Sequence, residues 1–518
     1  MDNISQETRG GRKAPTMRGA AAIQFASKYA SATLQVAITA VLSRVLTPEE
    51  FGPVAVVSVF TAFFTMLSDT GIGVAVVQFD DLTEDDYGAL LSFCGVFGVG
   101  LTAAFCLAGW PISWAYGDGS LVGLCAASSG ALLFGTLNMV PNGLLLKEKR
   151  FAAIGVRLLV ATAVSGAVAV AGALAGLGAY SLVLQPVVSA AVVFAWNLVA
   201  RPVRGLTLHF SGPIRRVAGY SGFQFGFNVV NYFSRNLDNL LIGRALGTVQ
   251  LAYYDKAYKL TTYPMSAFSG VIGSVVQPYM AEHQDDPGRV FGGWMRVQRV
   301  ISLVAAPAAA LLFCCADEVV LVLFGEQWGA SGPLLRALAP SVYFQMMNNT
   351  SGAFFQSLGR TDLMFRCSLV NTAVTVSAII AGIALGSSLA IAALVSAAYC
   401  AHIAAVVHYL VVRCFREGLG CLSAFAPDLA AAVASASLAL AAGRLVGGAT
   451  LLALASKVAV IALAYLVTEV ALGRIKGVMP YPEDSEEMGF GAIADSDACA
   501  RRSPFGGEAE SKCHPKEA

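Results

Sequence analysis

Two charged residues, Arg235 and Asp238, stand three positions apart in the stretch "NYFSRNLDNLLIG", Asn231 to Gly243. The surrounding segment has the hydropathy of a membrane span, where a charge at the centre costs at least about 2.5 to 3.5 kcal/mol. A guanidinium offers a planar fork of donors for an oxyanion, and a buried carboxylate can balance a charge or take up a cation or proton. The pair therefore predicts either a functional site within the membrane or a structural ion pair.

Polar side chains recur around these charges with the period of a helix. Two sets of four, offset by 200 residues, share one spacing: Gln24, Lys28, Ser31 and Gln35, and Gln224, Asn228, Asn231 and Arg235. Intervals of three and four place each set on one face of a helix. Such faces cannot point at lipid, so they line a watered cavity or a helix interface. The offset predicts that the two halves of the chain are repeats, each beginning with a helix that carries a polar seam.

Further polar residues follow in the next predicted helix of each half. The first half has Ser58, Thr61, Thr65 and Ser68 ending beside Asp69, and the second has Asp255, Lys259, Thr262, Ser266 and Ser269. These hydroxyls either line the cavity or bond their own backbone or a neighbouring helix, as hydroxyls in membrane helices commonly do. Lys256 and Lys259 either face the cavity near its outer end or extend to the membrane surface. For Lys457 we expect a structural ion pair or a position at the surface.

These residues must be positioned by membrane-spanning helices. Of 518 residues, 56% are hydrophobic and 13% are charged, so a soluble fold is excluded. Apolar windows of about 20 residues, including 151–174 and 333–358, recur along almost the whole chain. They predict an all-α, polytopic membrane protein with about 14 transmembrane helices in two pseudo-symmetric bundles around a central cavity. The predicted parts are a basic N-terminus (1–18), a six-helix bundle (19–200), a linker (201–216), a second six-helix bundle (217–413), two added helices (424–472) and a disordered tail (473–518).

The distribution of Lys and Arg predicts the orientation, because basic loops remain in the cytoplasm. Alternate breaks are basic, including Lys147, Lys149 and Arg150, then Arg201, Arg204, Arg215 and Arg216, whereas the other breaks offer little beyond Arg44, Arg244 and Arg444. Both termini are therefore predicted to be cytoplasmic. The net charge of +1 gives no reason to expect nucleic-acid binding, the eleven cysteines show no metal-binding spacing, and no GxxxxGK[ST] loop for ATP occurs.

Several motifs carry a resemblance to a known family. They are "LSRVLTPEEFGPVAVVSVFTAFFTMLSDTGIGVAVVQ", "LLLKEKRF", "GLGAYSLV", "LAYYDKAYKLTTYP", "FGEQWGASGPLLRAL" and "SLGRTDLMFR". From about Gly19 to Arg413 the sequence resembles the polysaccharide transporters of the multidrug/oligosaccharidyl-lipid/polysaccharide exporter superfamily. The last two predicted helices match only in hydropathy.

The resemblance implies a flippase of the bacterial inner membrane, not an enzyme. Such proteins carry undecaprenyl-diphosphate-linked oligosaccharides across the lipid bilayer for exopolysaccharide, capsule or O-antigen assembly, alongside polymerase and chain-length proteins. The implied mechanism is alternating access with no cofactor, coupled to a proton or sodium gradient. On this hypothesis the diphosphate binds Arg235, Lys28, Lys256 and Lys259. The sugars bind Gln24, Gln35, Asn228, Asn231, Gln345, Asn348, Asn349 and Gln356. Charge balance or coupling falls to Asp238, Asp69 and Asp255.

Three other classes compete with this hypothesis. A drug or organic-cation exporter of the same superfamily would share the fold but need an acidic cavity, and the predominance of Arg and Lys in the seam disfavours it. A membrane-bound polysaccharide polymerase or ligase would need a long outer loop with catalytic side chains, whereas the outer breaks are short. A structural scaffold would leave the intramembrane charges without a role.

Overall fold

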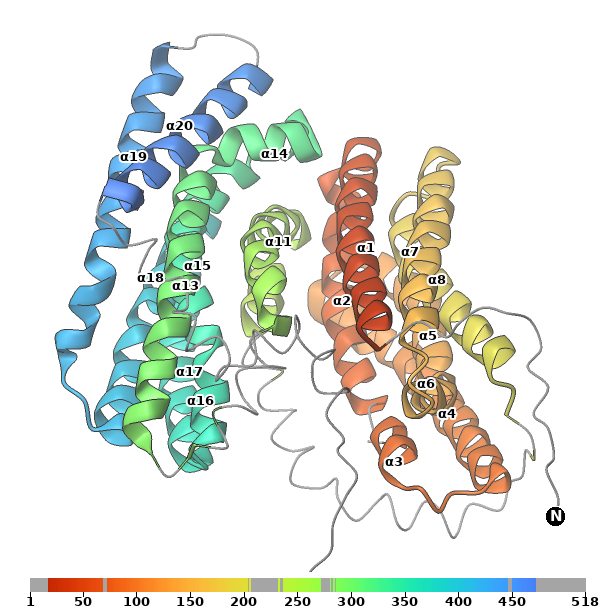
Figure 1. The fold of residues 1–518 in the computed structure, drawn as a ribbon. Coiled ribbons are helices and arrows are strands. Elements are labelled where there is room, and N and C mark those ends of the chain that lie inside the picture. Colours follow the sequence, from red (N-terminus) through yellow and green to blue (C-terminus); the bar gives the residue numbers. More distant parts are fainter. Residues whose placement is uncertain are drawn as a thin grey trace, which may run out of the picture. The chain divides into compact units, whose positions relative to one another are not determined.

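A computed structural model of the chain describes residues 17–68, 72–203, 205, 232, 236–271, 280, 283–284, 286–445 and 450–471. All of them belong to one compact unit, Met1–Leu472 (Figure 1). Within these ranges the regular structure is helical and no strand occurs, which confirms the predicted all-α class.

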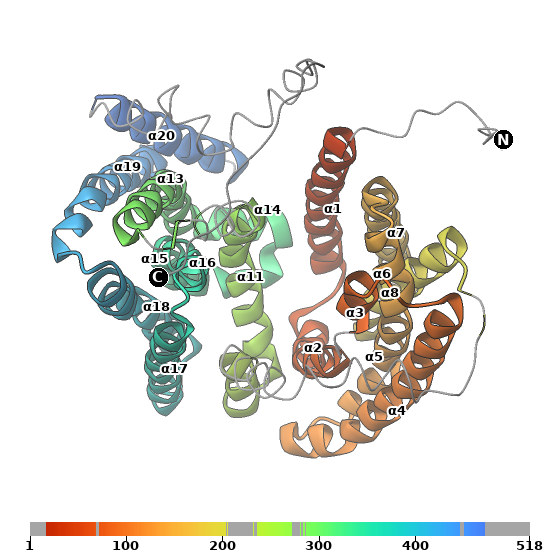
Figure 2. The same cartoon turned by 60° about the horizontal axis from the view of Figure 1, so that its bottom comes forward.

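Eight helices make up the first half of the chain, here called the N-terminal half. They are α1 (Met17–Val45), α2 (Pro48–Ser68), α3 (Ile72–Gln78), α4 (Glu84–Tyr116), α5 (Ser120–Leu137), α6 (Met139–Lys147), α7 (Phe151–Leu174) and α8 (Ala179–Ala200). In this half α1 packs along α7, and α5 packs between α4 and α8 (Figure 2). Small residues allow the close approach of α1 and α7, because a Cβ on Gly166 would lie 2.1 Å from Ile38 Cδ1.

The C-terminal half begins with a helix at 236–245. It continues with α11 (Thr248–Val271), α13 (Pro287–Cys314), α14 (Ala316–Phe324), the 3-10 turn η2 (Glu326–Trp328), α15 (Ser331–Asn349), α16 (Ser351–Ser357), α17 (Thr361–Ala384), α18 (Ser388–Val406), the π-helix η3 (Val407–Phe415), the 3-10 helix η4 (Leu419–Phe425), α19 (Ala426–Leu445) and α20 (Thr450–Ala471). Helices α19 and α20 pack against each other and against α13 (Figure 1).

Local sequence signals set several helix ends. Thr83 and Asp86 form a capping box at the start of α4, which satisfies backbone N–H groups that lack an intrahelical partner. Gly117 ends the same helix in the left-handed conformation, with a φ of 70°, which a residue without a Cβ adopts at little cost. Asp286 caps α13, and Pro287 follows at its first position, where a missing N–H costs nothing.

The two halves meet along α2 and α11 and where α1 approaches α14. A Cβ on Gly52 in α2 would lie 2.5 Å from the carbonyl oxygen of Thr248, at the start of α11. Buried apolar residues of both halves, such as Val56 and Leu251, form one continuous core across this contact. A glycine is therefore required where the two helices start side by side.

Ten helical segments in the described part are long and apolar enough to cross a membrane. The multi-span prediction is confirmed, whereas the count of fourteen is not. Helices α1, α11 and α15 have the length of a span but fall short in hydropathy, because they carry the polar side chains identified above. The apolar window predicted at 333–358 is divided at Thr350 into α15 and α16.

Candidate functional site

The polar seam of the first half lies on α1. Lys28, Gln24 and Gln35 are exposed side chains on this helix. Gln35 Oε1 accepts a hydrogen bond of 3.1 Å from Gln185 Nε2 of α8, so this amide is already engaged with a neighbouring helix. Exposure leaves Lys28 and Gln24 available to a ligand, and their predicted roles stay predictions.

The structure describes only part of the polar seam of the second half. Asn228, Asn231, Arg235 and Asp69 lie outside the described residues. Asp238 is buried, with 5% of its surface exposed. Its Oδ2 accepts a hydrogen bond of 3.2 Å from the Tyr254 hydroxyl, and its Oδ1 accepts one of 2.8 Å from the Asn239 backbone N–H. Within the part of the chain that the structure describes, no basic side chain pairs with this carboxylate.

Tyrosine rings extend from Asp238 toward α18. The Tyr254 ring stacks on that of Tyr258, with centroids 6.1 Å apart. The hydroxyls of Tyr258 and Tyr399 lie 3.2 Å apart, and the Tyr399 ring contacts His402 edge to face. Asp238 thus lies at one end of a row of hydroxyl-bearing rings. Hydrogen bonds join Tyr254 to Asp238 and Tyr258 to Tyr399, and ring stacking joins the two pairs, so the role of Asp238 in coupling stays a prediction.

The two lysines of α11 have different surroundings. Lys259 is exposed and forms an ion pair with Asp255, one turn earlier on the same helix, with Nζ and Oδ2 2.7 Å apart. Lys256 is 2% exposed. Its Nζ donates a hydrogen bond of 2.6 Å to Ser43 Oγ and lies 3.8 Å from the centroid of the Phe51 ring. Lys256 thus faces protein rather than an open cavity, a placement that disfavours its predicted role in diphosphate binding.

The predicted amides of the second half lie at the break between α15 and α16. Gln345 is buried and donates a hydrogen bond of 2.7 Å to Ser341 Oγ. Among the described residues, neither buried polar side-chain atom of Asn348 has a hydrogen-bond partner, whereas Asn349 and Gln356 are exposed. Buried amides without a partner are uncommon in folded proteins, so Asn348 is the amide of this group best placed to bind a polar ligand.

The hydroxyl stripe of α2 bonds its own helix. Ser58, Thr61 and Thr65 each donate to the carbonyl four residues earlier, and Ser68 donates to Thr65. Thr262 and Ser266 of α11 make similar bonds to carbonyls three residues earlier. This is the structural alternative considered from the sequence, and these hydroxyls need no ligand to be satisfied.

Arg157 is a residue that the sequence analysis missed. It lies in α7, and one guanidinium nitrogen donates to Oδ1 of Asn142 at 3.0 Å and of Asn197 at 2.6 Å. Its Nε is buried with no hydrogen-bond partner among the described residues, and Asn197 donates in turn to Asn138. A charged residue inside the apolar window 151–174 was the signal that could have found it.

Lys457 has the structural role expected for it. Its Nζ pairs with Glu318 of α14 and donates a hydrogen bond of 3.1 Å to the carbonyl of Cys314. This pair fastens α20 to the rest of the C-terminal half. Among the described residues, no group of three or more His, Cys, Asp or Glu side chains could hold a metal ion.

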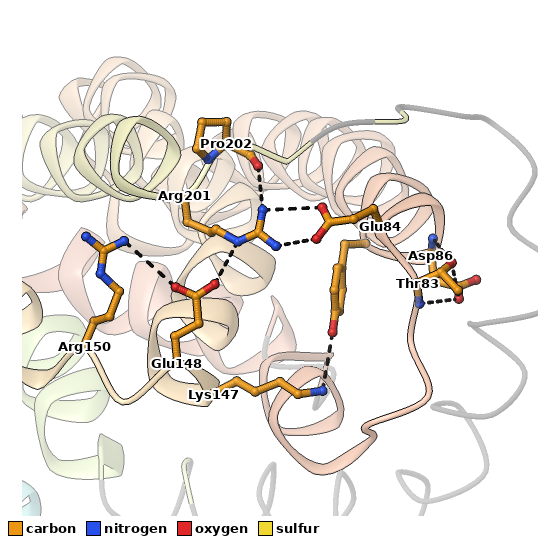
Figure 3. A network of polar contacts seen from close by, with 9 residues as sticks. Thr83, Glu84, Asp86, Lys147, Glu148, Arg150, Arg201 and Pro202 are labelled. Atoms are coloured by element: carbon orange, nitrogen blue, oxygen red, sulfur yellow. Dashed lines mark hydrogen bonds and ion pairs between the residues drawn. The ribbon is translucent and has the colours of Figure 1, made fainter. Parts of the chain in front are cut away.

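A second cluster of charges lies at one end of the N-terminal half (Figure 3). The Arg201 guanidinium, just after α8, pairs with Glu84 at the start of α4 and with Glu148 at the end of α6, the latter at 2.8 Å. Hydrogen bonds to Glu84 and Glu148 raise the pKa of Arg201 above its ordinary value. Nearby, Lys147 pairs with Asp80 at 3.3 Å. The cluster joins three helix ends and leaves the carboxylates partly exposed.

This architecture is that of a multi-span helical membrane protein. It resembles the lipid II flippase MurJ in an inward closed conformation, with a TM-score of 0.68 and 10% identity over 88% of this chain and 99% of that chain. It also resembles an inward-facing multidrug resistance MATE transporter of the MOP superfamily, with a TM-score of 0.57 and 15% identity over 74% of this chain and 93% of that chain. At these identities the likeness shows the fold.

Sequence comparison gives the family. The model of the polysaccharide biosynthesis protein family matches residues 41–333, more than half of the chain, and the chain belongs to this family. It is 26% identical to the succinoglycan biosynthesis transport protein ExoT of Rhizobium meliloti, over 70% of this chain and 73% of the relative. It is 25% identical to the lipopolysaccharide biosynthesis protein WzxC of Escherichia coli, over 66% of this chain and 70% of the relative. It is 24% identical to the teichuronic acid biosynthesis protein TuaB of Bacillus subtilis, over 64% of this chain and 69% of the relative.

Proposed function

We propose that this protein is a flippase that carries a lipid-linked oligosaccharide across the membrane for the assembly of a cell-surface polysaccharide. Membership of the polysaccharide biosynthesis protein family carries this proposal. The fold supports it, because a likeness to MurJ provides two helical halves that can move against each other around a polar path. One relative at 22% identity is named a probable low-salt glycan biosynthesis flippase.

We place the protein in the bacterial inner membrane with both termini in the cytoplasm. Basic residues at the end of α6 and after α8 support this orientation, since positive loops are retained inside. The end of the molecule where α1 leads into α2 and where α11 begins then faces outward. The carrier lipid would be undecaprenyl diphosphate, as the family resemblance implies.

The residues proposed for the head group divide by charge. Arg235 and Lys28 would bind the diphosphate, since a guanidinium and an ammonium are the side chains suited to phosphate oxygens. Asn348 would bind a sugar hydroxyl through its two unsatisfied polar atoms. Asp238 would carry the coupling proton or cation, or balance the charge of Arg235. The prenyl tail would remain in lipid while the head group crosses.

The localisation of lipid-linked repeat units tests the function. In a strain that lacks the protein, we expect these units to accumulate on the inner leaflet and the polymer to disappear from the surface. Accumulation on the outer leaflet would indicate loss of a polymerase instead and would contradict the proposal. The strain complemented with Arg235→Ala should retain the protein in the membrane but export no polymer, whereas normal export would remove Arg235 from the site.

A drug or organic-cation exporter is the second candidate. The likeness to a MATE transporter and the buried Asp238 favour it, because a buried carboxylate with no basic partner among the described residues can bind an organic cation. The same deletion strain distinguishes the two functions. Greater sensitivity to cationic drugs with unchanged polymer export would support the exporter.

A further inference from the structure

The ammonium of Lys256 lies at the contact of the two halves. Besides the hydrogen bond to Ser43 Oγ and the Phe51 ring, both from the N-terminal half, it lies 4.9 Å from the ring centroids of Phe324 and Trp328 of its own half. Among the described residues no carboxylate forms an ion pair with it, since neighbouring Asp255 pairs with Lys259. One hydroxyl and three aromatic faces therefore surround a buried cation.

Further hydrogen bonds converge on the same turn of the N-terminal half. Trp328 Nε1 donates to the Ser43 carbonyl at 2.7 Å, and Gln327 Nε2 donates to the carbonyls of Ser43 and Leu46, the latter at 2.9 Å. In the opposite direction, Arg44 donates to the Val322 carbonyl at 2.6 Å. The end of α1 and the segment from α14 to η2 are thus joined by several bonds that would break if the halves separated here.

We propose that Lys256 and Ser43 form a latch that holds the outer ends of the two halves together and is released when this end opens. An ammonium is costly to bury without a counter-ion, and here that cost is offset only while the hydroxyl and the three rings remain in place. When the halves separate, water solvates the ammonium, which lowers the cost of opening. The latch is therefore stable when assembled yet reversible. The proposal deepens the proposed function, because it assigns the closure of one end of the transport path.

Ser43→Ala and Ser58→Ala each remove a hydroxyl that is bonded to its own helix, Ser43 being buried and Ser58 exposed. Each hydroxyl donates a hydrogen bond of 2.7 Å to the carbonyl four residues earlier, but only Ser43 also accepts a hydrogen bond from Lys256. Ala252 provides a reporter, because it is 1% exposed and lies one turn from both Thr248 and Lys256 on the face of α11 toward α2. We would introduce Ala252→Cys into a full-length protein whose eleven native cysteines are replaced. Labelling with a membrane-impermeant maleimide would be timed in intact cells and in inside-out vesicles.

The Ser43→Ala variant should be labelled at least about tenfold faster than Ser58→Ala, because hydrogen bonds to charged groups are the stronger ones. Equal rates in the two variants would overturn the latch. If Ser43→Ala fails to accumulate in the membrane, Phe51→Leu takes its place, and Phe60→Leu of the same helix is its control. Faster labelling of Phe51→Leu would then support the latch, and equal rates would overturn it. Faster labelling in vesicles rather than in cells would keep the latch but reverse the proposed orientation. The assay requires no glycan, so failure of the latch is separate from failure of the flippase function.

Discussion

Lys256 and Arg201 both join distant segments of the chain, but by opposite means. Arg201 is paired with two carboxylates that are 38% and 52% exposed, so its contacts are formed in water. Among the described residues no carboxylate pairs with Lys256, which is enclosed by three aromatic rings and one hydroxyl. Exposed ion pairs contribute little because water competes for both charges, whereas buried aromatic contacts exclude water. We therefore expect the junction at Lys256 to contribute more to stability than the exposed ion pairs of Arg201.

The largest loss of stability should come from removing one of the three aromatic rings that surround Lys256, here called the aromatic wall (Phe51, Phe324 and Trp328). Trp328 is fully buried, so Trp328→Ala should lower the free energy of unfolding by about 3 to 5 kcal/mol through the lost packing. Thermal unfolding of the detergent-purified protein measures this change. Trp114→Ala is the control, since that side chain is 87% exposed and its loss should leave the melting temperature nearly unchanged. Equal shifts in the two variants would contradict the importance of the wall.

A smaller effect is expected from the ring nearest the ammonium. Phe51→Leu keeps an apolar side chain but removes the face that lies 3.8 Å from Lys256 Nζ. A cation–π contact contributes about 0.5 to 2 kcal/mol, and we expect a loss of this size in the same unfolding measurement. Phe60→Leu should cost less, because its ring contacts Tyr116 and no cation. The reverse order would indicate that Lys256 is held by packing alone.

The smallest effect should follow from breaking the exposed cluster. Arg201→Ala removes two ion pairs that each contribute about 0 to 1 kcal/mol. The melting temperature should fall slightly at low salt, and the difference should shrink as salt screens the charges. The Arg201→Lys variant keeps the charge but loses the planar guanidinium, so its melting temperature should lie between those of the wild type and Arg201→Ala. A loss as large as that of Trp328→Ala would refute the ranking of the two junctions.

Apolar windows predicted the spans because hydropathy is a property of consecutive residues. The predicted span from Phe151 to Leu174 coincides with α7. The break at Thr350 was missed, because averaging over a window does not detect where a backbone leaves the helix. Orientation and the lipid carrier remain predictions.

Side-chain partners were less predictable, because they depend on residues far apart in the chain. Spacing identified Lys256 as unusual, but its hydroxyl partner lies 213 positions earlier, so its burial could not be foreseen. For Lys457 an ion pair was one of two expectations, and Glu318 could be identified as its partner only once α20 was placed on α14. Arg157 was not predicted as a site residue although its charge lies within a predicted span, because it belongs to neither of the two repeated polar faces.

The glycine at position 52 also sets how closely the two halves can approach. A methyl group there would lie 2.5 Å from the carbonyl oxygen of Thr248, and this backbone atom cannot rotate away as a side chain could. Side chains of increasing size at this position would act as graded spacers between α2 and α11. If the protein is the flippase proposed above, a series from alanine to valine should increasingly favour a conformation in which these ends of the two halves lie further apart.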